Sequence, residues 1–118
     1  MAVLGSEEFD DWAMFSDKLS YYLCYRTDIE FIIKGGRSSV DSFTKRYAEE
    51  NKHPLSTIGR NTDAFGKMAA LRQINQIVES CDGIVFFGVK NDRDVGSIVK
   101  LCKSMSKPYR HVIDTNNR

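Results

Sequence analysis

The chain has 118 residues, which fits one domain, and its 42% hydrophobic and 28% charged residues argue against wholesale disorder. The formal net charge of +1 provides no global field that would draw the chain to nucleic acid or to an anionic membrane. We therefore expect a single domain over residues 1–113, followed by a polar tail over residues 114–118.

Strand-length apolar runs alternate with helix-period stretches in the first half of the chain. Residues 1–4 predict one strand, and the unbroken, β-branched run 29–33 predicts a second strand that is covered on both faces. A stretch of helical periodicity follows each strand. Residues suited to capping precede both helices: Asp10 or Asp11, and Ser38 or Ser39.

The second half of the chain continues this alternation. The predicted elements are a strand over 54–58, a helix over about 63–80, a strand over 83–87, a polar loop over 88–95, a helix over 95–105 and a strand over 108–113. This order predicts an α/β, Rossmann-like three-layer sandwich of about five parallel strands, with helices on both faces.

The three cysteines, Cys24, Cys81 and Cys102, are odd in number and far apart. Neither histidine, His53 or His111, lies close in sequence to another metal-binding residue. The sequence therefore predicts no metal site, no disulfide framework and no bound cofactor. Apolar neighbours predict that all three cysteines are small core residues, and His53, beside Pro54, is expected at the surface.

The acidic residues Glu7 and Glu8 interrupt the start of the chain and exclude a secretory signal peptide there. No apolar run reaches the ~20 residues that span a bilayer. We therefore expect a cytoplasmic protein that does not enter a membrane.

Ligands bind to open parallel sheets beyond the carboxyl ends of the strands. The best phosphate candidate there is the turn after the second strand, because two glycines are followed by a cation and a serine-capped helix start. This turn contains Gly35, Gly36, Arg37, Ser38 and Ser39. A tight turn with a serine cap is the structural alternative, because the GxGxxG and GK[ST] fingerprints are both absent.

Asp41 lies in the first turn of the following helix, where it either complements the helix dipole or binds a ribose or base. Gly96 and Ser97 could form a second anion site at the start of the last helix, and Lys67 is a further basic candidate. No Ser-His-Asp arrangement or GxSxG elbow is recognisable, so we assign no catalytic residue.

The chain resembles the SLOG superfamily of Rossmann-like nucleotide-binding domains over residues 3–113, and in particular its small, single-domain, YspA-like branch, which is related to lysine-decarboxylase-like phosphoribohydrolases. The matching segments are Leu4-Gly5-Ser6 with Phe9 and Asp10-Asp11, Gly35 to Asp41 with Ala48, Gly66-Lys67-Met68-Ala69, Cys81 to Phe87, and Gly96-Ser97. The resemblance implies a pocket for a nucleotide or nucleotide-derived ligand. It is also compatible with a homodimer, because related domains often pair through helices beside the sheet.

Departures from the family pattern bear on function. Glu7 and Glu8 replace the usual Arg after Gly-Ser and would repel a phosphate, and Ser39 replaces a third glycine. The family's Arg-Asn pair falls on Gln73 and Ile74, although Arg72 and Asn75 flank these positions. The hydrolase branch carries Glu where this chain has Lys100, which argues against that chemistry.

Three functions are compatible with these residues. The leading hypothesis is binding of a nucleotide-derived ligand without catalysis, by residues 35–39, Asp41, Lys67 and Arg72, with Gly96 and Ser97 on the other side and Gly5 and Ser6 as the floor. The alternative is a protein-interaction or inhibitor module, of phage or mobile-element origin, that acts on a host protein or sequesters a nucleotide signal. The third is a nucleotide N-glycosidase.

Overall fold

The computed structural model describes residues 1–6, 9–24, 26, 28–35, 38–59, 66–89 and 94–114. Its elements, in chain order, are β1 (Ala2–Gly5), α1 (Trp12–Leu23), β2 (Phe31–Ile33), α2 (Ser39–Asn51), β3 (Leu55–Thr57), the 3₁₀ turn η1 (Gly66–Met68), α4 (Ala69–Ser80), β4 (Ile84–Val89), α5 (Asp94–Ser104) and β5 (Tyr109–Asp114).

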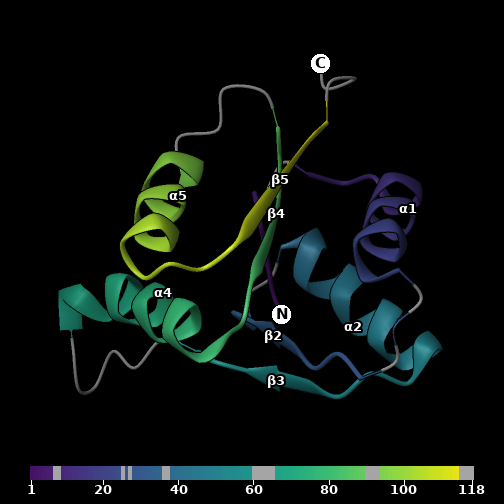
Figure 1. The fold of residues 1–118 in the computed structure, drawn as a ribbon, viewed down its shortest axis with the longest axis horizontal. Helices are drawn as coiled ribbons and strands as arrows, with labels where there is room; N and C mark the ends of the chain where they lie inside the picture. The colour runs from purple at the N-terminus through teal and green to yellow at the C-terminus, as the bar shows by residue number, and fades with distance from the viewer. Residues whose placement is uncertain are drawn as a thin grey trace.

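The five strands form one parallel sheet in the order β3-β2-β1-β4-β5. The chain first builds outward from β1 through β2 to β3, and then crosses back to place β4 against the other side of β1. This is the α/β, Rossmann-like arrangement that the alternating pattern predicts, with α1 and α2 on one side of the sheet and α4 and α5 on the other (Figure 1).

Two apolar cores lie on the two faces of the sheet. Val3, Val85 and Phe87 face α1 and α2, whereas Leu4 and Phe86 face α4 and α5. Neighbouring residues of one strand therefore belong to different cores, as the two-residue period of a strand requires. Because both faces of the sheet are buried, the central strands are continuous apolar runs rather than alternating apolar and polar residues.

Local capping fixes the starts of α1 and α2 as predicted. Asp11 is the N-cap of α1 and accepts a hydrogen bond from the Met14 amide at 3.0 Å. Ser38 is the N-cap of α2 and accepts from the Asp41 amide at 3.3 Å. Each cap satisfies an amide that has no carbonyl partner within its helix.

Several boundaries differ from the sequence-based expectation. Ile29 lies before β2, and β4 runs through Gly88 to Val89, so the expected loop over 88–95 begins too early. Asp94 already belongs to α5, so the expected loop also ends too late. The glycine at position 88 suggested a turn, but it continues the ladder and pairs with Ile113 of β5.

Two side-chain predictions were wrong. His53 is buried rather than at the surface, because its ring stacks on Tyr47 and its Nδ1–H donates to the Ile29 carbonyl oxygen at 3.1 Å. Cys24 is exposed rather than in the core, because it caps the end of α1 beyond Leu23, the last buried residue of that helix. Cys81 and Cys102 are buried as expected.

Among the described residues, no helix is long and apolar enough to cross a membrane. No group of three or more His, Cys, Asp and Glu side chains in this part of the chain could hold a metal ion.

Candidate functional site

The carboxyl edge of the sheet, where all five strands end, contains the position at which the strand order reverses. β1 is followed in the sheet by β2 on one side and by β4 on the other. Helices leave on opposite faces at such a position, and ligands of open α/β sheets bind there. The Ser6 amide donates to the Phe87 carbonyl oxygen at 2.9 Å, so the end of β1 remains joined to β4 at this position.

The start of α2 packs directly on the end of β1 because residue 5 is glycine. A Cβ atom at Gly5 would lie 2.3 Å from Val40 Cγ2 and 2.9 Å from the Phe87 carbonyl oxygen. Real side chains do not approach so closely, so only glycine allows this packing. The structure thus brings together four of the predicted ligand-binding residues: Gly5, Ser6, Ser38 and Asp41.

The side chains at this junction are mostly packed inside the protein. Ser6 is 6% exposed and Asp41 is 3% exposed. Phe9 is fully buried against Phe87, with ring centroids 5.3 Å apart, and so fills space beside the end of β4. At 3% exposure, the Asp41 side chain offers little surface to a ligand.

Ser38 and Ser39 are the accessible polar side chains of this helix start, since both are partly exposed. The Ser38 hydroxyl oxygen accepts from the Asp41 amide, which leaves its own hydrogen available to donate to an acceptor. The amides of the first helical turn add partial positive charge at the same place.

Gly35 begins the predicted phosphate turn and has a geometric reason to be glycine. Its φ is +77°, and a Cβ atom there would lie 2.4 Å from Thr57 Cγ2 of β3. Gly36 and Arg37, the centre of the predicted turn, lie outside the described residues. Gly35 is thus needed for the backbone path whether or not a ligand binds, which is what a simple tight turn with a serine cap would require.

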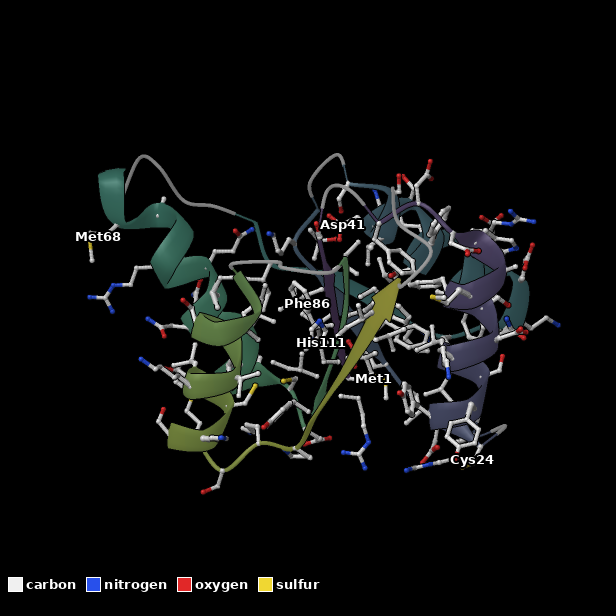
Figure 2. The ribbon with its side chains drawn as sticks, turned by 90° about the horizontal axis from the view of Figure 1, so that it is seen from above. Met1, Cys24, Asp41, Met68, Phe86 and His111 are labelled. Carbon is white, nitrogen blue, oxygen red and sulfur yellow. The ribbon has the colours of Figure 1, made fainter. Side chains whose placement is uncertain are left out.

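The other predicted residues lie on separate elements. Gly96 and Ser97 are exposed in the first turn of α5, where a Cβ atom at Gly96 would meet nothing within 4 Å. Lys67 belongs to η1, and its neighbour Met68 lies at the outer end of α4, well away from Asp41 in Figure 2. Arg72 is exposed on α4.

Sequence reasoning missed the structural role of Gln73, which it treated only as a departure from an expected Arg-Asn pair. Gln73 is 4% exposed, and its Nε2 donates to the Lys34 carbonyl oxygen at 3.2 Å and to the Ile58 carbonyl oxygen at 3.0 Å. Both carbonyls follow strand ends, one after β2 and one after β3. A single amide from α4 therefore ties two strand ends together. Its partner position, Ile74, packs against the core between the sheet and α4.

The amino edge of the sheet, where the strands begin, carries a hollow that no sequence pattern indicated. It has a volume of about 590 Å³ and lies between the starts of β1 and β2, β3 and the end of α4. Its charged lining includes Arg26, Asp28, Glu30 and Asp82. The whole lining comes from four separate chain segments, namely Met1 and residues within 26–32, 56–58 and 80–82, so no local motif could reveal the hollow.

The titratable groups with perturbed pKa values lie mainly at this amino edge. A hydrogen bond from Arg26 lowers the pKa of the Asp28 carboxyl, and the same bond raises the pKa of the Arg26 guanidinium. Burial raises the pKa of the Cys81 thiol, and burial also raises the pKa of the Cys102 thiol, which belongs to α5. Neither buried thiol is activated as a nucleophile, since activation requires a lowered pKa.

Comparison of the chain with protein-family models, curated proteins and solved structures found no match.

Proposed function

We propose that the carboxyl edge binds a nucleotide or a nucleotide-derived ligand without chemically changing it. The observation that carries the proposal is the packing of the α2 start against the end of β1, at the reversal of strand order. Gly5 permits this packing, and the Ser38 cap presents amides and a hydroxyl beside it. A phosphate is the anion best suited to such a helix start.

We include Arg37 in the same proposed site, because this cationic residue follows Gly35 by two positions in the sequence. A guanidinium and a phosphate can form two parallel hydrogen bonds, which makes arginine more selective for phosphate than lysine. In this proposal residues 35–39 hold the phosphate, and Gly96 and Ser97 of α5 contact the far side of the ligand. Asp41 positions the helix start from inside.

Isothermal titration against nucleotides, cyclic nucleotides and ADP-ribose-type compounds tests the proposal. We expect binding that Arg37→Ala weakens at least about tenfold, because even one hydrogen bond between charged groups contributes about 1.5–3 kcal/mol. Arg26→Ala is the matched control, because it removes the same charge from the opposite edge. Absence of binding at millimolar ligand, or equal loss in both variants, overturns the proposal.

A second candidate is a protein-interaction module that has kept the fold without a functional pocket. The packing of Ser6, Phe9 and Asp41 favours it, because the described side chains at the end of β1 leave little surface for a ligand. A pull-down that captures one partner at fixed stoichiometry, together with silent ligand titrations, would establish this function instead.

The phosphoribohydrolase hypothesis predicts release of a free base from a nucleoside monophosphate. Lys100, which stands where the hydrolase branch has Glu, is exposed on α5 and supplies no carboxylate. We expect no free base when the chain is incubated with a panel of nucleoside monophosphates. Chromatography of the products measures this directly.

A further inference from the structure

A second, smaller hollow lies at the amino edge of the sheet, between α1 and the starts of β4 and β5. It has a volume of about 190 Å³, and its lining includes Tyr22 of α1 and residues 83–85 and 108–110. Pockets for small molecules ordinarily measure about 300–1,000 Å³. This hollow, which we call the tyrosine hollow, is therefore too small for such a ligand, and its size suits a single side chain of a protein partner.

Two tyrosines line the tyrosine hollow, and a third lies beside them. Tyr22 packs partly against the core beneath α1 and α2, whereas Tyr109 packs partly against the core on the other face of the sheet. Tyr21 is 74% exposed, and its ring centroid lies 5.6 Å from that of Tyr22. Tyrosine is enriched at protein interfaces, because its rigid ring buries a large area at little cost in conformational entropy. The composition of this surface thus favours a protein partner.

The side chain of Arg110 lies on the face of the sheet that α1 and α2 cover. Its ladder neighbour Val85 and the nearby Val112, two positions along β5, both belong to the core beneath these helices. Side chains alternate between the faces of a strand, so Arg110 projects on this face too, where it remains exposed. Its Nη1 donates to the Tyr109 carbonyl oxygen at 3.0 Å, which keeps the guanidinium close to β5.

Arg110 differs from two other arginines in its charge partners. Arg26 pairs with Asp28 at 3.0 Å. Arg46 pairs with Glu50 at 3.1 Å. Within the part of the chain that the structure describes, no carboxylate lies within 4.0 Å of the Arg110 guanidinium. A guanidinium has five N–H donors and can hold a carboxylate by two parallel hydrogen bonds. Arg110 therefore has N–H groups that can donate to a carboxylate of another molecule.

The charges around the tyrosine hollow favour an acidic protein segment over a nucleic acid. Affinity for nucleic acid comes from several cations along a phosphate chain. Among the described residues that line this hollow, Arg110 provides the single cationic side chain. The larger hollow, which shares Met1 with it, carries the carboxylates of Asp28, Glu30 and Asp82. These carboxylates would repel a chain of phosphates, whereas one carboxylate can approach Arg110 alone.

We propose that the tyrosine hollow is the docking site for an acidic segment of a partner protein. One apolar side chain of that segment fills the hollow, and a neighbouring carboxylate pairs with Arg110. An apolar anchor beside a charge-assisted hydrogen bond of arginine is typical of interface hot spots. This surface gives the protein-interaction function considered above a defined position, and it does not depend on ligand binding at the carboxyl edge.

Small acidic probes test the proposal on the full chain by NMR. N-acetyl-leucine offers one apolar side chain and one carboxylate, and millimolar amounts should shift the amide signals of residues 83–85 and 109–110 in a saturable way. N-acetyl-leucinamide lacks the carboxylate, and N-acetyl-glycine lacks the apolar side chain. Each should bind at least about tenfold more weakly, because one charge-assisted hydrogen bond or one buried leucine side chain accounts for at least that factor.

Substitution of single arginines separates this docking site from nonspecific attraction. Arg110→Gln removes the charge of an exposed side chain, so it should weaken binding of N-acetyl-leucine at least about tenfold and abolish the preference for this probe over its amide. Arg46→Gln is the matched control and should leave binding unchanged. Arg46 also lies beside an aromatic ring, 4.0 Å from the centroid of Trp12, but it is already paired with Glu50.

Five results overturn the proposal. The first is the absence of saturable shifts at residues 83–85 and 109–110. The second and third are equal affinities for N-acetyl-leucine and its amide, and equal losses in Arg110→Gln and Arg46→Gln. The fourth is N-acetyl-glycine that binds as tightly as N-acetyl-leucine, because the hollow then anchors no side chain. The fifth is inorganic phosphate that gives the same shifts with the same affinity, because the site then binds anions in general.

Discussion

The carboxyl edge and the amino edge of the sheet differ in how tightly their residues are packed. At the carboxyl edge the backbone is tightly constrained: Gly5 and Gly35 each lie where a Cβ atom would collide with a neighbour, and Gln73 ties two strand ends. At the amino edge a hollow of about 590 Å³ is lined by exposed charged groups, among them the Arg26–Asp28 ion pair. Constraint and open volume thus lie at opposite ends of the same strands.

This difference shows which structural features glycine and serine residues in a sequence indicate. They mark places where the chain turns, caps or approaches itself closely, which is a property of a few consecutive residues. A hollow depends instead on side chains from distant segments. The tight turns and caps of the carboxyl edge can therefore be predicted from the sequence whether or not this edge binds a ligand. Substitutions at both edges can show which residues are needed for stability and which are needed for binding.

The largest effect is expected from Gly5→Ala. The added Cβ would overlap Val40 Cγ2 and the Phe87 carbonyl oxygen, so α2 must shift away from β1. Overpacking of this kind lowers the free energy of unfolding by about 2–3 kcal/mol. Gly96→Ala is the matched control, because it meets nothing within 4 Å and should raise helix stability by up to about 1 kcal/mol. Urea denaturation measures both, and equal effects would mean that Gly5 is not constrained by α2.

Gln73→Leu should have the next largest effect on stability. It leaves the Lys34 and Ile58 carbonyl oxygens without the amide that now donates to both. Loss of buried hydrogen bonds costs about 1–3 kcal/mol of the free energy of unfolding. Gln76→Leu, on the exposed surface of the same helix, should cost much less. If both variants unfold at the same urea concentration, the tie between strand ends contributes nothing.

Much of the fold was predictable because each element carries its own local signal. The unbroken apolar runs over 29–33 and 83–87 indicated strands covered on both faces, and Asp11 and Ser38 cap their helices as expected. The end of β4 was not predictable, because Gly88 is as suited to a turn as to a tightly paired strand, and only pairing with β5 decides between them.

The candidate site was predictable only in part. Gly5, Ser6, Ser38 and Asp41 were all named from the sequence and do come together. Burial of Asp41 was not foreseeable, since a carboxylate in a first helical turn is ordinarily exposed. The double hydrogen bond of Gln73 also depends on the path of α4 across two strand ends, which no local pattern contains.

At the amino edge, burial raises the pKa of the Cys81 thiol although the nearby N-terminal ammonium acts in the opposite direction. Its raised pKa stabilises the folded state fully below the ordinary thiol value of 9.0, and this contribution is lost as the pH rises through the folded-state pKa. The stability difference between the wild type and Cys81→Ala should therefore narrow in alkaline solution. A difference that stays constant from neutral to alkaline pH would contradict this assignment.

Thiol labelling rates should distinguish the exposed cysteine from the two buried ones. Cys24 is exposed at the end of α1, so one thiol per chain should react rapidly with a disulfide reagent. Cys81 and Cys102 are buried and should react only as the fold opens. The variant Cys24→Ser should lose the rapid phase entirely, and a rapid phase that survives this change would show that a core thiol is accessible.

The smallest effect on stability is expected where charges are most exposed. Arg26 and Asp28 form an ion pair at 3.0 Å, but their side chains are 61% and 69% exposed, so water screens the attraction. Arg26→Ala should therefore lower the thermal midpoint at neutral pH only slightly. It should still raise the pKa of Asp28 toward its ordinary value of 3.8, because the hydrogen bond that lowers it is lost. Carboxyl chemical shifts followed by NMR against pH measure this change.

The lowered pKa of Asp28 favours the folded state above pH 3.8, and this contribution disappears as the pH falls through the folded-state pKa. If the midpoint at neutral pH falls as far in Arg26→Ala as in Gly5→Ala, the amino edge is as constrained as the carboxyl edge, and the contrast between them fails.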